Sequence, residues 1–382
     1  METVGIICEY NPFHNGHLYH INEVKKRYPN AIIILIMSGN FTQRGHISIL
    51  NKWDKTKIAL YYGVDLVIEL PFVFATQSAD IFAKGSIALL KALQVKKLVF
   101  GSESDAIENL IELANIQLHN SRYDILVKQY LDTGINYPSA MSKALLDITG
   151  KTITAPNDLL GLSYVKEIIR QKANIEPITI ERTNQFHDIT LNSNIVSASA
   201  IRNALKEQKV IDQYVPKKTQ EYLKTGLINK DYFPFIQYKI ITEPNTLSQI
   251  QTVDEGLHAR LIEKITNTKS LEDFIKKVKT KRYTYNKLMR MSCHILCHFT
   301  KEEAKRNTEV RYIRILGMSK LGQFYLNQYK KQINLPIITA CNQIKDEMLE
   351  IEYRTSCIYS MIQEQDISKQ EFSKKPIRKE NE

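Results

Sequence analysis

The chain has 382 residues, of which 43% are apolar and 24% charged, a composition that excludes a disordered or collagen-like chain. Its longest apolar run, Ala31–Met37, is far shorter than the ~18 residues that a membrane span needs, and no basic segment precedes an apolar stretch at the N-terminus. Five cysteines without the spacing of a small disulfide scaffold fit reduced thiols. We therefore expect a cytoplasmic protein with no signal peptide and no membrane partner.

The net charge of +11 is unevenly distributed. Residues 1–200 contain 19 basic and 19 acidic residues, whereas residues 201–382 contain 33 basic and 22 acidic residues. A basic region favours a polyanionic partner, and nucleic acid is the commonest large one; a solvated, lysine-rich surface is the alternative. The two parts of the chain are therefore expected to have different tasks.

Strand-like and helix-like segments alternate through the first 200 residues. The expected strands are Val4–Cys8, Ala31–Met37, Asp65–Leu70, Lys97–Phe100 and Pro177–Glu181. The expected helices are His17–Arg27, Asn51–Tyr62, Ser78–Leu93, segments up to about Ile148, Asp158–Gln171 and Ala198–Lys206. This alternation predicts an α/β fold with a doubly wound, parallel, Rossmann-like sheet, which binds ligands at the carboxyl ends of its strands near the topological switch point.

The pattern changes after about residue 207, where glycine becomes scarce and helical periodicity dominates. The expected helices there are Leu257–Ile265, Leu271–Val278 and Tyr285–Phe299, and the polar stretch Glu207–Lys218 is the expected boundary. We therefore predict a catalytic domain over residues 1–207, a basic, mainly α-helical domain over residues 208–372, and a disordered basic tail over residues 373–382.

The strongest chemical signal is the motif His14-Asn15-Gly16-His17, which follows the first expected strand and opens a helix. A helix N-terminus offers unpaired N–H groups to phosphate, and Gly16 lets the backbone approach an anion closely. His14 and His17 can each donate a hydrogen bond to phosphate, and binding the pentavalent α-phosphate more tightly than the ground state would make them catalytic. His20, one turn later, can face the same site. The alternative is that these histidines cap or pack the loop.

A second motif, Val196-Ser197-Ala198-Ser199-Ala200-Ile201-Arg202, places hydroxyl groups and an arginine at another helix start. Ser197, Ser199 and Arg202 are suited to grip phosphates, because hydroxyl and N–H groups meet the anion while the guanidinium adds a forked donor. Alone, this motif fits an ordinary capped helix.

Together the two motifs resemble the HxGH and ISxSxIR signatures of the nucleotidylyltransferase superfamily, which releases pyrophosphate after attack on the α-phosphate of ATP. The resemblance to the tRNA(Met) cytidine acetate ligase family is closer still and covers the whole chain. It rests on the segments 9–17 (EYNPFHNGH), 37–45 (MSGNFTQRG), 100–103 (FGSE), 156–158 (PND) and 311–317 (RYIRILG). The resemblance implies an enzyme that uses ATP to form acetyl-adenylate from acetate. The enzyme then acetylates N4 of the wobble cytidine of elongator methionine tRNA.

The resemblance also implies the nucleotide site. ATP would lie along Ile7, Cys8, Glu9, Tyr10, Asn11, Pro12, Phe13, His14, Asn15, Gly16, His17, Leu18, Tyr19 and His20, with Gly101, Asn157 and Arg182 completing the site and Mg²⁺ neutralising the leaving charge. Other interpretations remain open for two of these residues. Arg182 can form a surface ion pair with Glu181 or Asp188, and Asn157 can merely cap the next helix. Cys8, among apolar neighbours, is expected to be buried and without a catalytic role.

Two further segments carry reactive residue types. The loop Ser38–Ile47 holds Gln43, Arg44 and His46; it can close over the site, hold the acetate carboxylate or be a surface loop, and the sequence does not decide between these. The segment 293–298 (CHILCH) has metal-ligand residue types at helical spacing. A zinc site needs four ligands and no second pair lies nearby, so we favour a packed helix and expect no metal site.

Basic residues interleaved with tyrosines form the candidate tRNA surface. Its predicted members are Lys276, Lys277, Lys279, Lys281, Arg282, Arg311 and Arg314, and the first run continues to Lys287 and Arg290. Basic side chains suit phosphates, and Tyr283 and Tyr285 can stack on unpaired bases. A solvated helix face with its tyrosines in the core is the alternative.

Two other functions remain open. One is a small-molecule adenylyltransferase of cofactor metabolism, which needs no basic helical domain and is disfavoured by the charge of residues 201–382. The other is a non-catalytic protein that binds nucleotide and RNA without turnover.

Overall fold

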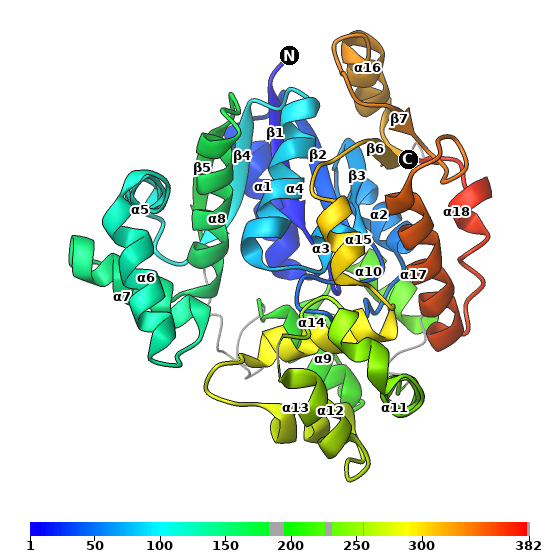
Figure 1. Cartoon of the computed structure of the whole chain (residues 1–382). Coiled ribbons are helices and arrows are strands. Elements are labelled where there is room, and N and C mark those ends of the chain that lie inside the picture. The colour runs from blue at the N-terminus through cyan, green and yellow to red at the C-terminus, as the bar shows by residue number, and fades with distance from the viewer. Residues whose placement is uncertain (183–194, 226–230, 255, 380–382) are drawn as a thin grey trace.

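The computed structural model describes residues 1–182, 195–225, 231–254 and 256–379 of the chain. A single sheet runs through its centre in the order β5-β4-β1-β2-β3-β6-β7, with β8 paired to β6 (Figure 1). The strands are β1 (Thr3–Cys8), β2 (Ile32–Ser38), β3 (Leu66–Leu70), β4 (Lys97–Ser102), β5 (Glu176–Glu181), β6 (Ile313–Met318), β7 (Ile337–Ile338) and β8 (Ile377–Arg378).

The first five strands are parallel, which confirms the predicted doubly wound α/β sheet. The chain builds β1, β2 and β3 in one direction and then returns to place β4 on the other side of β1. The switch point therefore lies between β1 and β4, and the carboxyl ends of these two strands form the place where such a sheet binds ligands.

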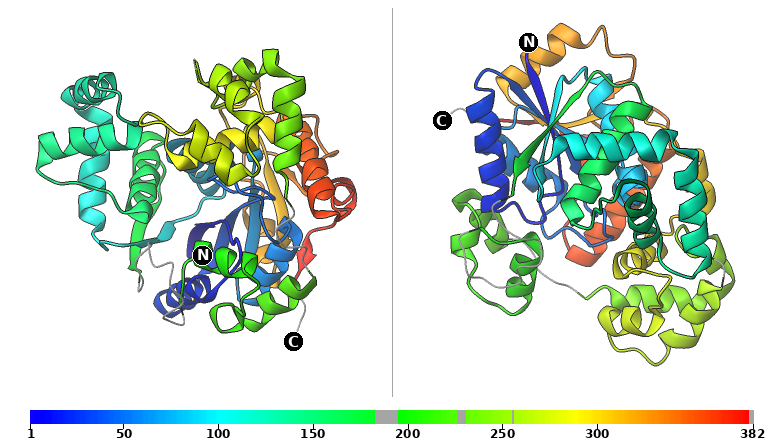
Figure 2. Two further views of the ribbon diagram at one scale, coloured as in Figure 1. Left: turned by 90° about the horizontal axis from the view of Figure 1, so that it is seen from below. Right: turned by 90° about the vertical axis from the view of Figure 1, so that its left-hand side faces the viewer.

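Helices cover both faces of the sheet, which explains why its strands are apolar without alternation. On β2, Ile33 and Leu35 face one layer of helices, whereas Ile34 and Ile36 face the other. The first layer contains α1 (Asn15–Arg27), α2 (Lys52–Tyr61), α9 (Ala198–Lys206), the 3₁₀ turn Asp212–Tyr214 and α10 (Lys217–Thr225). The second contains α3 (Phe72–Ala75), α4 (Ala79–Ala92), α8 (Pro156–Arg170) and α17 (Glu347–Gln363), and Figure 2 shows both layers from other sides.

A helical insertion separates β4 from β5. It consists of α5 (Ile107–His119), α6 (Ser121–Asp132) and α7 (Tyr137–Thr149), and it projects from the sheet beside α8 (Figure 1). Buried apolar residues of the insertion, such as Leu110 and Leu113, join the core beneath α8.

The helices that follow α10 build a smaller core of their own. They are α11 (Phe233–Thr242), the 3₁₀ turn Pro244–Gln249, α12 (Leu257–Ile265), α13 (Leu271–Val278) and α14 (Tyr285–Leu296), followed by α15 (Lys301–Arg306). In Figure 1, α14 lies below the carboxyl ends of the strands. His294 ties it there, because its Nε2 lies 2.7 Å from the carbonyl oxygen of Thr76 and its Nδ1 lies 3.0 Å from that of Gln251. The segment 293–298 is thus the packed helix end that we favoured.

The chain then returns to the first sheet, which corrects the predicted domain division at residue 207. β6 pairs antiparallel with β3, α16 (Lys320–Tyr329) follows it, and β8 pairs with β6. The predicted disordered tail over residues 373–382 is also wrong for residues 373–379, because α18 (Gln370–Ser373) and β8 are ordered elements. Residues 380–382 lie outside the described residues. Local sequence patterns do not reveal that these strands join the first sheet, because β6 pairs with β3 (Gly317 opposite Val67) and β8 pairs with β6 (Ile377 opposite Gly317), both far away in the sequence.

A buried ion cluster fastens this returning segment to the sheet. Lys52 Nζ lies 2.6 Å from Glu69 and 2.7 Å from Glu371, and Arg314 bridges the same two carboxylates at 2.9 Å and 2.6 Å. All four side chains are almost completely buried. Arg314 therefore cannot contact tRNA, and its predicted role in the RNA surface is wrong.

In the described part of the chain, no helix is long and apolar enough to cross a membrane.

Candidate active site

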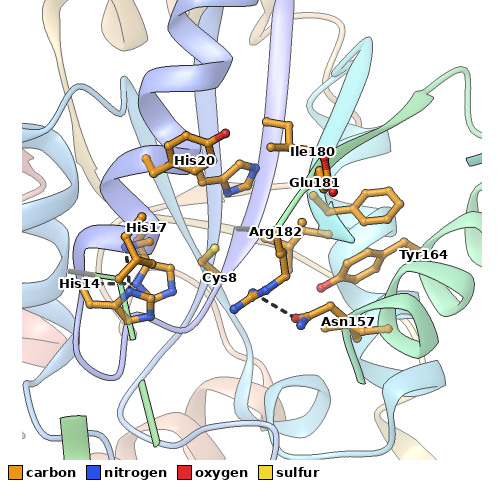
Figure 3. A pocket seen from close by; sticks show the side chains of 16 residues that line it. Cys8, His14, His17, His20, Asn157, Tyr164, Ile180, Glu181 and Arg182 are labelled. Atoms are coloured by element: carbon orange, nitrogen blue, oxygen red, sulfur yellow. Dashed lines mark hydrogen bonds between the residues drawn. The ribbon is translucent and has the colours of Figure 1, made fainter. Parts of the chain in front are cut away.

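A pocket opens at the switch point, between α1, the carboxyl ends of β1, β4 and β5, and the start of α8 (Figure 3). Its lining includes ten of the residues predicted for the nucleotide site: Ile7, Cys8, His14, Gly16, His17, Tyr19, His20, Gly101, Asn157 and Arg182. These come from sequence positions as far apart as β1 and the residue after β5. The sheet thus brings together the residues that the sequence motifs indicated.

Six lining residues were not predicted. They are Phe100, Leu160, Tyr164, Ile180, Glu181 and Ile195. Phe100 and Tyr164 meet edge to face with ring centroids 5.7 Å apart and form an apolar wall with Ile180. Positions on β4 and β5 next to Gly101 and Arg182 could have indicated Phe100 and Ile180, since these strands end at the same edge. No pattern in the sequence around Tyr164 indicates a pocket residue; it lines the pocket because of its position on α8.

His14 and His17 are held by the start of α1. His14 is the N-cap, and its Nδ1 accepts a hydrogen bond from the Gly16 N–H at 3.0 Å. The His14 N–H in turn donates to Nδ1 of His17 at 3.2 Å, which completes a reciprocal capping box. Because each Nδ1 is an acceptor, each neutral ring carries its proton on Nε2. Capping and function are therefore not alternatives here, because the caps leave two Nε2–H donors free in the pocket.

Burial keeps these rings neutral. Desolvation, reinforced by the positive charges of Arg182 and Arg202, lowers the pKa of His14 to about 3. Desolvation, followed by the neighbouring His14 and Arg182, holds the pKa of His17 well below its usual value. The two ring centroids are 3.8 Å apart, a separation that two imidazolium ions would not tolerate. The pair is thus suited to donate hydrogen bonds to an anion at neutral pH, without acting as a proton source.

His20 contributes a different group. Its pKa is lowered to about 4, mainly by desolvation and then by Arg182. Its buried Nε2 has no hydrogen-bond partner among the described residues, and the ring faces the pocket (Figure 3). A ligand that offers a hydroxyl or an amine near His20 would satisfy this nitrogen.

Arg182 and Asn157 form the opposite side of the pocket. Nη1 of Arg182 lies 3.4 Å from Oδ1 of Asn157, and Nδ2 of Asn157 donates to Oε1 of Glu103 at 2.5 Å. A Cβ on residue 101 would lie only 3.2 Å from Cγ of Arg182. Glycine at this position therefore leaves room for the arginine side chain. Among the described residues no carboxylate lies within ion-pair distance of Arg182; Asp188, one of its predicted partners, lies outside them. Its guanidinium therefore remains available to a ligand.

Arg202 joins the second motif to the first. Its Nη1 donates to the carbonyl oxygen of Asn11 at 2.8 Å, and its Nη2 donates to Ser199 Oγ at 3.0 Å. Ser197 caps α9 by accepting from the Ala200 N–H at 3.1 Å. Ser197, Ser199 and Arg202 therefore stand beside the loop that leads to His14, although none of them lines the pocket.

The other residues of the predicted nucleotide segment support the loop and do not line the pocket. Tyr10 and Phe13 are buried, and Phe13 stacks on Tyr62 with ring centroids 5.2 Å apart. Asn11 Oδ1 accepts from the Ile49 N–H at 2.9 Å, and Asn15 Nδ2 donates to Gln213. The remaining members are Glu9, Pro12 and Leu18, of which Glu9 accepts from the Gln43 N–H at 2.5 Å.

Lys55 is a buried residue that sequence reasoning missed. Its Nζ donates to three carbonyl oxygens, those of Glu9 at 3.0 Å, Ser38 at 2.8 Å and Gly39 at 2.7 Å. Desolvation lowers its pKa to about 7. The ammonium group therefore ties together the carboxyl ends of β1 and β2, from which the pocket loop and the loop Ser38–Ile47 emerge.

The loop Ser38–Ile47 is packed, not exposed. Phe41 pairs with Ile47 across it, and a Cβ on Gly45, which has φ of +81°, would lie 2.5 Å from the Met289 carbonyl oxygen of α14. Gln43 donates to the carbonyl oxygen of Gln77 at 2.9 Å. A plain surface loop is therefore excluded; a role in holding acetate stays a prediction.

The other predicted tRNA residues lie on the surface. Lys276 and Lys277 pair with Glu272 and Asp273 along α13, each at 2.8 Å. Lys279, Lys281 and Arg282 are exposed in the loop between α13 and α14. Arg311 donates two hydrogen bonds to Asp346, from Nε to Oδ2 at 2.6 Å and from Nη2 to Oδ1 at 2.9 Å. Of the two tyrosines, Tyr283 is buried in the small helical core, whereas Tyr285 is exposed.

A family model described as HIGH Nucleotidyl Transferase matches residues 1–375. A protein of Anoxybacillus flavithermus named tRNA(Met) cytidine acetate ligase is 42% identical over 381 residues, covering 95% of each chain. A protein of Geobacillus sp. with the same name is 40% identical, covering 99% of this chain and 100% of its own.

Solved structures agree. Apo Thermotoga maritima TmcAL superposes with a TM-score of 0.91 at 31% identity, and TmcAL bound with alpha-thio ATP superposes with a TM-score of 0.88. Both comparisons cover 99% of each chain. The fold is that of a HIGH nucleotidyl transferase. Within that class, the chain belongs to the tRNA(Met) cytidine acetate ligase family.

Proposed function

We propose that this protein is an ATP-dependent acetate ligase that forms acetyl-adenylate and acetylates N4 of the wobble cytidine of elongator methionine tRNA. The observation that carries the adenylation chemistry is the pair of neutral histidines, whose Nε2–H groups face the pocket at the start of α1. The acceptor is supported by the names of the relatives and by the basic surface of residues 201–382.

ATP would occupy the pocket along its length. The apolar wall of Phe100, Tyr164 and Ile180 suits the adenine base, and the unpartnered Nε2 of His20 suits a ribose hydroxyl or the base amine. The α-phosphate would lie at the N-terminus of α1, within reach of His14, His17 and Arg182. The segment from Ser197 to Arg202 adjoins this end, where the β- and γ-phosphates would extend.

The proposed reaction has two steps. In the first, a carboxylate oxygen of acetate attacks the α-phosphorus, the bond to the β-phosphate oxygen breaks, and pyrophosphate leaves. His14 and His17 stabilise the charge on the equatorial oxygens by hydrogen bonds that strengthen in the transition state. In the second, the cytosine N4 amine attacks the acetyl carbonyl carbon, AMP leaves, and N4 loses a proton. The base must leave its stack to reach the adenylate.

Mg²⁺ would accompany ATP. The described residues contain no group of three His, Cys, Asp or Glu side chains that could hold a metal ion by itself. This fits an ion held mainly by phosphate oxygens, since Mg²⁺ in such sites is bound by few carboxylates. Bound there, it would neutralise charge on the departing pyrophosphate.

The decisive experiment is nucleoside mass spectrometry of bulk bacterial tRNA that lacks the modification, after incubation with the protein, ATP and labelled acetate. Labelled N4-acetylcytidine is the expected product. Acetate-dependent pyrophosphate release without an acetylated nucleoside would retain the adenylation step and remove the cytidine acceptor. If a sample that binds ATP yields neither labelled N4-acetylcytidine nor acetate-dependent pyrophosphate release, the proposal is overturned. A metabolite adenylyltransferase or a non-catalytic binding protein would then be favoured.

The exposed basic loop is the proposed outer contact for tRNA. Reversing the charge at Lys281 and Arg282 should weaken tRNA binding and flatten its salt dependence, because fewer counterions are released. The same reversal at Lys276 and Lys277, which already pair with acidic neighbours, should have a smaller effect. An unaltered salt dependence in the first variant would exclude the loop. The proposed action on tRNA places the protein in the cytoplasm.

A further inference from the structure

Lys55 lies beneath two neighbouring loops at the pocket edge of the sheet. β1 and β2 are paired in parallel along their length, so the residues that follow them leave the same edge side by side. The Lys55 Nζ contacts three carbonyl oxygens at this edge. They belong to Glu9, which follows β1, to Ser38, which ends β2, and to Gly39. One buried side chain thus joins the first residues of two loops.

The two loops carry different parts of the site. The first leads from Glu9 to His14 and His17, whereas the second is the loop Ser38–Ile47. The carboxylate of Glu9 also bonds across this junction, because its Oε1 accepts from the Gln43 N–H at 2.5 Å. Glu9 is therefore fastened to the second loop twice, through its side chain and, by way of the ammonium group, through its carbonyl oxygen. The two histidines consequently have a fixed place relative to the second loop.

The contacts of Lys55 use every donor of a charged ammonium group. An ammonium group has three N–H donors, and each here meets one carbonyl oxygen at 2.7–3.0 Å, whereas a neutral amine has only two. Loss of the proton would leave one of these carbonyl oxygens without its donor, which costs free energy comparable to a lost hydrogen bond. The link between the two loops therefore depends on the protonation of Lys55.

Charged groups on three elements act on this proton. Glu9 after β1 and Glu69 on β3 favour the ammonium form, and Lys52 on α2 opposes it. Desolvation outweighs the two carboxylates and lowers the pKa of Lys55 to about 7. The third contact is therefore complete below this pH and is lost as the pH rises above it.

Lys55 is placed to act on the reaction only through the backbone. Its side chain is completely buried, it is not one of the residues that line the pocket, and carbonyl oxygens occupy its three donors. It differs in this from His14 and His17, whose Nε2–H groups face the pocket.

We propose that Lys55 is a positioning residue for adenylation, which holds the loop Ser38–Ile47 and the loop leading to His14 in the arrangement that attack on the α-phosphate requires. This inference rests on the proposed function and adds to it a residue outside the pocket that sets the rate of the first half-reaction. A misplacement of about 1 Å can cost about 10²-fold in rate. ATP binding should depend on Lys55 much less, since the apolar wall and Arg182 belong to the other side of the pocket (Figure 3).

Two substitutions of Lys55 test the proposal. Lys55→Met keeps the stem and removes the ammonium group, so kcat for acetate-dependent exchange of pyrophosphate into ATP should fall by about 10²-fold, with KM for ATP within about twofold. Lys55→Arg supplies donors that stay charged, so it should recover about tenfold of the lost rate. Lys57→Met is the matched control, because Lys57 is a partly exposed lysine of the same helix that pairs with Asp54 at 2.9 Å; it should keep the original kcat.

The pH profile separates positioning from a purely structural role. Because kcat/KM reports groups of the free protein, its value for the original protein divided by that for Lys55→Arg should fall by about tenfold from about pH 6 to about pH 9. Only lysine loses its proton in this interval, and the ratio cancels the ionisation of ATP, which both proteins share.

Each way of failing has its own result. Thermal unfolding gives the folded fraction of each variant, and a loss of kcat that only follows the folded fraction would overturn the inference. A raised KM for ATP at unchanged kcat would mean that Lys55 supports nucleotide binding, which also overturns it. If Lys55→Met does not fold, the pH profile decides, and a constant ratio refutes the positioning role. Absence of pyrophosphate exchange in the original protein would instead defeat the proposed function.

Discussion

The carboxylates of Glu103, which follows β4, and Asp158, in the first turn of α8, each accept a hydrogen bond from the other residue's backbone N–H. Oε2 of Glu103 accepts from the Asp158 N–H at 3.0 Å, and Oδ1 of Asp158 accepts from the Glu103 N–H at 3.0 Å. Asp158 also accepts from Ser102 Oγ at 2.5 Å. This reciprocal pair fastens the end of β4 to the first turn of α8, and it gives a structural reason for the two short sequence motifs that contain these residues.

The first prediction concerns Glu103, whose Oε1 also orients the amide of Asn157 toward Arg182. Glu103→Gln keeps the shape but turns an amide N–H toward backbone donors, so Asn157 and Arg182 lose their fixed positions. We expect KM for ATP to rise by about tenfold, equivalent to roughly 1–2 kcal/mol, with kcat little changed. Steady-state pyrophosphate exchange measures both constants. Glu108→Gln, exposed in the first turn of α5, is the matched control; equal KM values for the two variants would contradict the prediction.

The second prediction separates the two roles of His17. In His17→Asn the amide oxygen can replace Nδ1 as the acceptor of the His14 N–H, but nothing replaces the Nε2–H donor. In His17→Gln the amide can reach the Nε2 position while the cap is lost. We expect His17→Asn to keep its thermal stability and lose about 10²–10³-fold in adenylation rate.

His17→Gln should show the reverse balance, with lower stability and a smaller loss of rate, because it loses the cap and keeps a donor. Both are measured by differential scanning calorimetry and pyrophosphate exchange. Should the two variants lose stability and rate in the same proportion, the capping box and the catalytic donor would not be separable functions of the ring.

The third prediction is acid sensitivity of the folded state. Burial lowers the pKa of His14 and His46 to about 3 and of His20 and His294 to about 4, whereas an unfolded chain has a histidine pKa of 6.5. The unfolded chain therefore binds protons below pH 6.5 that the folded protein excludes. The free energy of unfolding should therefore keep the full contribution of these rings above pH 6.5. Below that pH it should fall by about 1.4 kcal/mol per pH unit for each such ring.

Urea unfolding at neutral pH and near pH 5 measures this slope. His46→Gln should reduce the slope by the share of one ring, since His46 is half-buried and glutamine does not titrate. A free energy of unfolding that stays constant over this interval would show that the buried histidines take up protons as readily as free ones.

The fourth prediction concerns the buried ion cluster. Arg314→Met removes one cation and leaves Glu69 and Glu371 with Lys52 alone, so the variant should lose about 3–5 kcal/mol of stability. Its folded fraction should bind tRNA with the original salt dependence, because Arg314 is inaccessible. Chemical unfolding and filter binding test these two statements. If folded Arg314→Met binds tRNA with a shallower salt dependence than the original protein, Arg314 does contribute to RNA binding and the prediction is wrong.

Local patterns predicted what depends on neighbouring residues in the sequence. The strand, loop and helix that carry His14 and His17 could be recognised because capping acts over three residues. Arg314 could not, because its burial depends on Glu69 and Glu371, which no pattern around residue 314 reveals. Its flanking segment contains two arginines three residues apart, a spacing that also fits an exposed helix face. Tyr164 was missed for a related reason: only the tertiary fold aims it at the pocket.

The buried ion cluster joins residues from early and late parts of the chain, and this bears on the order in which the protein matures. A ribosome delivers Lys52, Glu69 and every lining residue of the pocket long before it delivers Arg314 and Glu371. N-terminal segments ordinarily begin to fold first, but here β3 keeps an open edge until β6 emerges, and Lys52 lacks its second close carboxylate, Glu371, until α18 emerges. A nascent chain can thus hold the whole nucleotide site in its sequence and still have an unfinished sheet. The sheet and its buried ion cluster are therefore complete only after the segment up to Glu371 has been synthesised.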